Sequence, residues 1–128
     1  MKKVLKITER GWAGHFIGSA SCRFRRNTLI EYGNKRWIVS TVGSYHPSYP
    51  RNKKLDKHEQ EIGINRFYET MAFEAMKKGV YWEIRVEKEI PFKSNWALNE
   101  LEEGTDLKAD KMHEKVVAEL SKKIQNGY

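Results

Sequence analysis

The chain has 128 residues, of which 39% are hydrophobic and 32% charged, and this fits one domain with a single core. Charged residues alternate with aromatic ones, which excludes a wholly disordered polymer. Lys and Arg number 24 against 17 acidic residues, a net charge of +7. That balance favours negatively charged partners such as nucleic acid, nucleotides or an acidic protein face, and it argues against a protein that mimics DNA.

The first segments of the chain predict an intracellular location. The single cysteine, Cys22, excludes an internal disulfide and suits a reducing cytoplasm. The N-terminus begins with two lysines but has no long apolar run after them, so it resembles neither a signal peptide nor a membrane span. No later window approaches the roughly 18 apolar residues that a spanning helix needs, so we expect no membrane partner.

The N-terminal half predicts strands. Residues 3–7 fit a short first strand, and residues 15–17 fit a brief strand between glycines. The clearest local signal is Gly33-Asn34, which separates two runs rich in β-formers and marks a two-residue hairpin. This register would set Glu31 opposite Arg36 and Ile30 opposite Trp37. The nearly continuous apolar or β-branched run at 37–42 predicts a central strand.

The middle of the chain alternates loop and strand patterns. Residues 43–61 contain two prolines and many charges, which predicts a long exposed loop, either a flap or a disordered segment. Residues 62–76 fit strand spacing slightly better than helical spacing. Residues 80–92 place apolar side chains at even positions and polar ones at odd positions, which predicts a long strand with one buried face.

The C-terminal part predicts helix. Residues 95–101 fit a helical turn capped by Ser94 or Asn95, and residues 105–126 fit a long helix capped by Thr105 or Asp106. Within that helix an apolar stripe recurs every three to four positions, at Met112, Val116, Val117, Leu120 and Ile124. We therefore predict one α+β domain over residues 1–128, an antiparallel β-sheet covered by a long C-terminal amphipathic α-helix. The aromatic surface left over favours a dimer or larger homo-oligomer.

Three arginines lie within four residues in the segment Cys22-Arg23-Phe24-Arg25-Arg26-Asn27. Strand alternation sends Arg23 and Arg25 to one face and Arg26 to the other. Guanidinium groups grip phosphate oxygens with forked hydrogen bonds, and Asn27 could read a sugar hydroxyl or a base edge. The alternative is a charged edge strand that discourages aggregation.

Aromatic and polar residues elsewhere could complete a nucleotide site. A base could stack on Tyr68 or Phe73 with Arg66 on its phosphate, and Asn95-Trp96 offers an amide and a ring near the sheet–helix junction. Core roles for these rings, and a helix cap for Asn95, are the alternative. The predicted ligand-binding residues are Arg23, Arg25, Arg26, Asn27, Arg66, Tyr68, Phe73, Asn95 and Trp96.

Signals for catalysis are weaker, so we expect no catalytic residues, no metal site and no cofactor. The four histidines, His15, His46, His58 and His113, lack metal-ligand spacing. Cys22 could be a nucleophile with His15 as its general base, but one cysteine near one histidine is weak evidence for catalysis. Glu83, Glu87 and Glu89 share one strand face and could hold Mg²⁺, but nearby Lys and Arg make ion pairs a simpler role.

Three stretches together resemble small proteins encoded by phages and prophages of gut and soil bacteria: ITERGWAGHFIGSASCRFRRNTLIEYGNKRWIVSTVG, RFYETMAFEA and KADKMHEKVVAEL. The size, the basic strand-rich body and the terminal helix are similar to the phage anti-Thoeris proteins that sequester cyclic ADP-ribose signals. That resemblance implies ligand binding without catalysis, at subunit interfaces of an oligomer in the host cytoplasm.

Two functional hypotheses follow. The first is a non-catalytic sponge that captures a cyclic nucleotide or an ADP-ribose-derived signal. The second is an inhibitor of the anti-CRISPR kind, whose basic face binds nucleic acid or a ribonucleoprotein in a salt-dependent way. A metal-dependent nuclease or phosphodiesterase is a lesser alternative.

Overall fold

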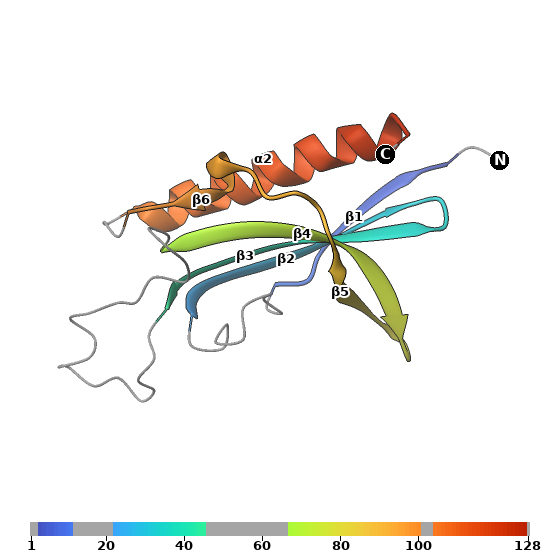
Figure 1. Cartoon of the computed structure of the whole chain (residues 1–128), viewed down its shortest axis with the longest axis horizontal. Helices are drawn as coiled ribbons and strands as arrows, with labels where there is room; N and C mark the ends of the chain where they lie inside the picture. Colours follow the sequence, from blue (N-terminus) through green and yellow to red (C-terminus); the bar gives the residue numbers. More distant parts are fainter. Residues whose placement is uncertain (1–2, 12–21, 46–66, 101–103, 128) are drawn as a thin grey trace.

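The computed structural model describes residues 3–11, 22–45, 67–100 and 104–127, which form an antiparallel sheet with one long helix across a face (Figure 1). The predicted α+β class with a C-terminal helix is confirmed. Three predicted segments lie outside the described residues: the brief strand at 15–17, most of the loop at 46–61 and the start of the next strand at 62–66. The elements are β1 (Leu5–Glu9), β2 (Cys22–Tyr32), β3 (Lys35–Tyr45), β4 (Tyr68–Lys78), β5 (Tyr81–Glu89), η2 (Ser94–Trp96), β6 (Ala97–Leu98) and α2 (Thr105–Gln125).

The strands follow one another across the sheet in the order β1-β2-β3-β4-β5, with every neighbouring pair antiparallel. Strand β6 pairs with the start of β4, at Tyr68 and Glu69, while β5 pairs further along β4. Strand β3 pairs with the opposite edge of β4, so β4 has partners along both edges. Among the described strands β1 and β5 form the outer edges of the sheet.

The β2–β3 hairpin has the register that the sequence predicts. Glu31 lies opposite Arg36 and Ile30 opposite Trp37. The Arg36 Nε atom is 2.7 Å from Glu31 Oε2, so the facing charges form an ion pair. Gly33 has φ of 64°, a left-handed conformation that glycine adopts at low cost and that a tight hairpin turn requires. Strand β3 continues to Tyr45, so the predicted loop at 43–61 begins at least three residues too early.

Helix α2 buries the stripe that its sequence predicts. The main core cluster joins this stripe to the inward side chains of β2, β3 and β4, and Leu5, Tyr32, Ile90 and Phe92 pack against it. The predicted caps are wrong, because the helix begins after Gly104 (φ 87°) with no side-chain cap, and Thr105 is already helical and buried. No described helix combines the length and apolar character needed to cross a membrane. The buried members of the cluster are Ile30, Trp37, Val39, Ala72, Trp96, Val116, Val117, Leu120 and Ile124.

Strand β5 does not bury one continuous face, and that prediction is wrong. Its pairing with β4 shifts between Ala75↔Ile84 and Phe73↔Glu89, so five residues of β5 span two of β4. An odd shift in register turns the following side chains to the other face of the sheet. Ile90 and Phe92 therefore pack under α2, and Val86 remains exposed. The β4–β5 hairpin bends away from the helix (Figure 1).

The segment before α2 also differs from its prediction. In place of a helical turn over 95–101, one 3-10 turn at Ser94–Trp96 leads into the two-residue strand β6. The Trp96 side chain is buried in the main cluster, with its ring edge-on to Phe92 at 6.2 Å between centroids. Burial of this ring ties the segment to the helix, and the pairing of β6 ties it to the sheet.

Candidate functional site

Two neighbouring rows of the sheet place polar side chains under α2. Residues that are in register on adjacent strands share a face of the sheet. One row contains Glu9 and Thr28, and the next contains Arg26, Thr41 and Thr70. An apolar stripe from α2 covers most of this face, so polar groups here need partners within the protein.

His113 of α2 supplies those partners. Its Nε2 atom is 2.6 Å from Thr28 Oγ1, and its Nδ1 atom is 2.7 Å from Thr41 Oγ1. Thr28 donates its only hydroxyl proton to Glu9 Oε2 at 2.7 Å, so it must accept a proton from Nε2. A neutral imidazole then accepts at Nδ1 from Thr41, whose oxygen accepts from Thr70 at 2.6 Å. The network therefore fixes His113 as the Nε2–H tautomer.

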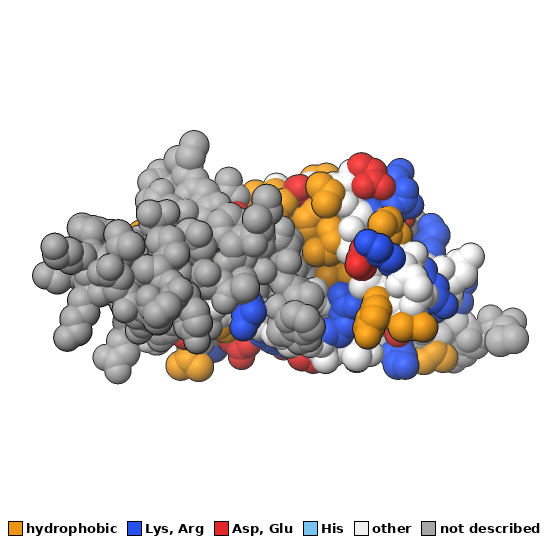
Figure 2. All heavy atoms as spheres, turned by 90° about the horizontal axis from the view of Figure 1, so that it is seen from below, with side chains coloured by type: hydrophobic (Ala, Val, Ile, Leu, Met, Phe, Trp, Pro, Cys, Tyr) orange, Lys and Arg blue, Asp and Glu red, His pale blue; other side chains and the backbone are white. Residues whose placement is uncertain are grey.

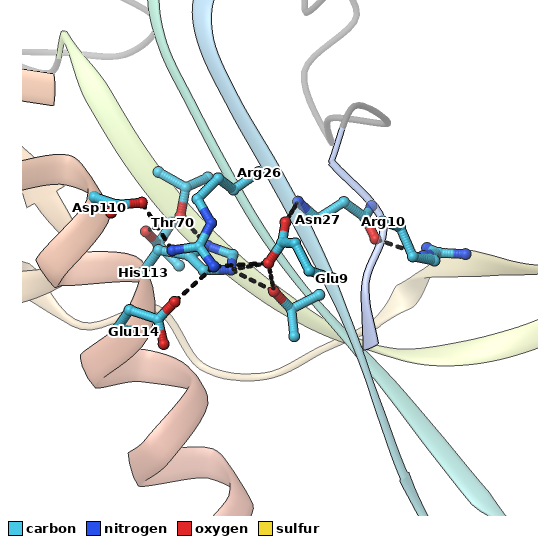
Figure 3. A network of polar contacts seen from close by, with 10 residues as sticks. Glu9, Arg10, Arg26, Asn27, Thr70, Asp110, His113 and Glu114 are labelled. Atoms are coloured by element: carbon cyan, nitrogen blue, oxygen red, sulfur yellow. Dashed lines mark hydrogen bonds and ion pairs between the residues drawn. The ribbon is translucent and has the colours of Figure 1, made fainter. Parts of the chain in front are cut away.

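Arg26 connects the same network to the acidic edge of α2. Its guanidinium donates to Glu9 Oε2 at 2.7 Å and to Asp110 Oδ1 at 2.8 Å, and it lies 2.6 Å from Glu114 Oε1 (Figure 3). The Arg26 side chain is 19% exposed, and its carboxylate partners are more open to solvent. The planar fork of the guanidinium directs separate N–H groups to carboxylates on β1 and on α2. Arg26 thus joins β1, β2 and α2.

The environment sets the charge states of this network. Burial lowers the pKa of His113 to about 4, and the charge of Arg26 acts in the same direction, against the nearby carboxylates. Burial raises the pKa of Glu9, but hydrogen bonds from Arg26 and Thr28 outweigh it and hold the pKa below its ordinary value. Burial lowers the pKa of Arg26, but its bonds to Glu9 and Glu114 outweigh burial and hold the pKa above its ordinary value. At neutral pH the pair Glu9–Arg26 is charged and His113 is neutral.

The arginine cluster predicted to grip phosphate is divided by the fold. Arg26 points toward α2 and is bound by carboxylates, so its charge is already compensated. Arg25 precedes it in an extended strand and is directed to the opposite face, half-buried. Asn27 is 1% exposed, and its Oδ1 accepts from Arg10 Nε at 2.8 Å. The backbone of Arg23 lies in β2, and its side chain is outside the described part.

The predicted stacking residues lie in the core. Tyr68, Phe73 and Trp96 are 1–3% exposed, so none presents a ring face to solvent. The Tyr68 hydroxyl donates to Asp106 Oδ1 at 2.6 Å, which anchors the start of α2 to β4. Arg66 lies outside the described residues. The placement favours the core alternative for all three rings.

A groove runs beside α2 where the helix meets η2 and β6. It has a volume of about 190 Å³ and joins two of the predicted residues to three lysines that the prediction omitted. Lys108 is paired with Glu100 at 2.7 Å. Among the described residues no ion pair is formed by Lys111, and the charge of Lys115 acts on Glu119 of the same groove without a close ion pair. The groove is lined by Asn95, Trp96, Leu98, Lys108, Lys111, Met112, Lys115, Val116 and the carboxylate Glu119, so lysines outnumber the single acid three to one.

Helix α2 separates its charges into two edges. At 100° per residue, Asp106, Asp110 and Glu114 fall on the edge that faces Arg26. Lys108, Lys111, Lys115 and Lys122 fall within about 60° of one another on the other side. The carboxylates of the acidic edge bind Tyr68 and Arg26 of the sheet, whereas the lysine edge is exposed to solvent. The basic side of α2 is therefore the part of this site available to an anion.

Sequence reasoning missed His113 as the centre of a network. Two features of the sequence could have indicated it. His113 lies beside Met112 on the apolar side of α2, and threonines occupy inward positions of β2, β3 and β4. The proposed Cys22 nucleophile is buried, and burial raises the pKa of its thiol to about 11, so the reactive thiolate is scarce. Glu83 and Glu87 lie beside Lys78 and Arg85, and no three metal-ligating side chains gather within the described ranges.

Comparison with family models, with curated proteins and with solved structures found no match to this chain.

Proposed function

We propose that this protein binds a phosphorylated nucleotide without changing it chemically, and that the groove beside α2 holds the phosphate. The observation that carries the proposal is the convergence of Lys108, Lys111 and Lys115 on one open groove. Lysine ammonium groups act as point charges for phosphate, and the exposed amide of Asn95 adds a donor at the rim.

The wall of this groove contains an unsatisfied donor. The Trp96 side chain is 3% exposed, and its Nε1–H has no hydrogen-bond acceptor within the described part of the chain. A buried donor without a partner costs about 1–3 kcal/mol. A ligand oxygen or a water molecule that reached this donor would recover part of that cost, which favours an oxygen-rich ligand.

The volume of the groove limits how much ligand it holds. About 190 Å³ is below the roughly 300–1,000 Å³ of pockets that enclose a whole drug-sized ligand. The phosphate and part of the sugar fit, and the rest of the nucleotide needs another covering surface. A subunit interface would provide one, as the resemblance to anti-Thoeris proteins implies. We therefore propose that the ligand is a cyclic nucleotide or an ADP-ribose derivative, sequestered in the host cytoplasm as a phage-type evasion of immunity.

Calorimetry against a panel of cyclic nucleotides and ADP-ribose isomers tests this proposal. The variant Lys111→Ala/Lys115→Ala should weaken binding by at least about tenfold, because it removes two of the three lysine charges of the groove. Lys122→Ala is the matched control: it removes a lysine from the same side of α2 but outside the groove, and binding should be unchanged. Heat should release the ligand intact. Absence of binding across the panel, or recovery of a hydrolysed ligand, would refute the proposal.

Nucleic-acid binding is the second candidate, and one observation favours it. Lys108, Lys111, Lys115 and Lys122 form a stripe from residue 108 to residue 122 of α2, a rise of about 21 Å at 1.5 Å per residue. Such a stripe could follow a phosphate backbone. Here Lys122→Ala should weaken binding as much as Lys111→Ala, and affinity for RNA or DNA should fall steeply with salt. The effect of Lys122 thus separates the two candidates.

A further inference from the structure

A second groove lies beside α2, where the segment between β5 and η2 runs along the helix (Figure 1). It has a volume of about 100 Å³ and contains two lysines, Lys93 of that segment and Lys123 of the last turn of α2. On the other side of the sheet, which Figure 2 shows, charges of both signs mix with apolar side chains over the part that is not grey. The lysines of the second groove, by contrast, share it with one carboxylate, that of Glu119.

The charges of the second groove are only partly compensated. The Lys93 ammonium group donates to Glu119 Oε1. The same ammonium group lies against that of Lys123 and lowers the pKa of Lys123, while the charge of Glu119 opposes this more weakly. Two like charges thus lie close together beside a single acid, and an anion placed between them would relieve their repulsion. Phosphate suits this position, since lysine ammonium groups bind it as point charges.

The second groove adjoins the lysine groove that contains Lys111 and Lys115, because Trp96 and Glu119 line both. A ligand that occupied both grooves would pass the ring of Trp96, whose buried Nε1–H lacks an acceptor within the described residues. Along α2, Lys115 of one groove and Lys123 of the other are separated by a rise of about 12 Å at 1.5 Å per residue. Two phosphates joined through one oxygen lie closer together than this, whereas a sugar between them sets them apart.

We propose that the second groove binds a second phosphate group, so that the ligand is a nucleotide whose two phosphates are separated by at least one sugar and lie on either side of Trp96. The inference rests on the proposed function, because it assigns the first phosphate to the lysine groove. It also narrows the class of ligand. Nucleotides with two separated phosphates fit both grooves, and those with one phosphate or a single diphosphate fit only one.

Calorimetry with two matched probes tests the second phosphate site. The dinucleotide pApA carries a 5′-phosphate and an internucleotide phosphate, whereas ApA carries only the internucleotide phosphate. Wild-type protein should bind pApA about tenfold more tightly than ApA. Lys123→Ala should remove most of this difference and leave the affinity for ApA unchanged. Lys122→Ala is the matched control, since it removes the neighbouring charge from outside both grooves, and it should preserve the difference.

The outcomes separate this inference from the proposed function. Equal affinity for pApA and ApA, or equal weakening of pApA by Lys122→Ala and Lys123→Ala, would refute the second site. Weakening of both probes by Lys111→Ala/Lys115→Ala would still support the lysine groove in that case. If neither probe binds, the second site is refuted, and the wider nucleotide panel tests the lysine groove by itself.

The indole N–H resonance of Trp96 supplies a measurement that does not depend on affinity. Its disappearance in the variant Trp96→Phe assigns it in nuclear magnetic resonance spectra. Saturating pApA should shift this resonance more than saturating ApA does, because only pApA spans the ring. An unchanged resonance at saturating pApA would contradict a ligand that lies across Trp96.

Discussion

Acidification should destabilise this protein through His113. The side chain is completely buried, and its pKa falls from an ordinary 6.5 to about 4 in the folded state. Between those two values the unfolded chain binds a proton at His113 that the folded chain does not. The free energy of unfolding therefore falls with falling pH, by about 1.4 kcal/mol per unit, and this loss ends near the folded pKa. The whole window corresponds to about 3 kcal/mol, a large part of the stability of a small domain.

The geometry around the imidazole explains why a proton is costly there. Nε2 already donates to Thr28, and Nδ1 accepts from Thr41, so a second proton would remove the acceptor of the Thr41 hydroxyl. The charge of Arg26 opposes protonation as well, while Glu9, Asp110 and Glu114 favour it. Burial outweighs the three carboxylates because they are partly exposed and already bound to Arg26.

Urea unfolding followed by circular dichroism, over a series of pH values, measures this effect. Other acidic groups titrate in the same range, so the variant His113→Gln is the reference: its amide keeps a donor and an acceptor but does not titrate. The variant should be less stable than wild type at neutral pH. This difference should shrink by about 3 kcal/mol on acidification to about pH 4. A difference that stays constant across the window would refute the buried neutral imidazole.

Three further predictions concern single positions. Arg26→Met should lower the free energy of unfolding by about 1–3 kcal/mol in urea titrations, because three partly exposed carboxylates lose their common partner; unchanged stability would make Arg26 available for a ligand. Gly43→Ala should lower it by about 1–3 kcal/mol, since an added Cβ would lie 2.6 Å from Tyr68 Cγ and from the Phe67 carbonyl; a stable variant with an unshifted melting temperature would contradict that packing. Cys22 should resist iodoacetamide in the native protein and react in urea, because burial raises its thiol pKa to about 11; rapid native labelling would be the opposite result.

The local pairing of the sheet could be predicted because it depends on neighbours in the chain. Gly33-Asn34 permits one tight turn, and the turn fixes the register of every residue along β2 and β3. The apolar stripe of α2 could be predicted for the same reason, since the spacing of apolar residues along the helix determines which face is buried. For β5 the same logic failed, because a register shift against β4 is a property of two strands and alternation within one strand cannot reveal it.

The candidate site shows the same division. Three arginines within four residues predicted a phosphate site, but their sequence could not show that Asp110 and Glu114 of α2 lie against Arg26. Contacts between residues more than 80 positions apart depend on how the helix is placed across the sheet. The lysine groove has the same origin, because it brings Asn95 of the η2 segment beside Lys111 and Lys115.

The sequence by itself determined the fold class, the hairpin register and the buried face of the helix, since each follows from short-range periodicity and turn chemistry. Tertiary structure alone decided which charges are compensated and which remain exposed. Partners for Arg26 and His113 come from separate elements, and a charge is available to a ligand only when packing leaves it without such partners.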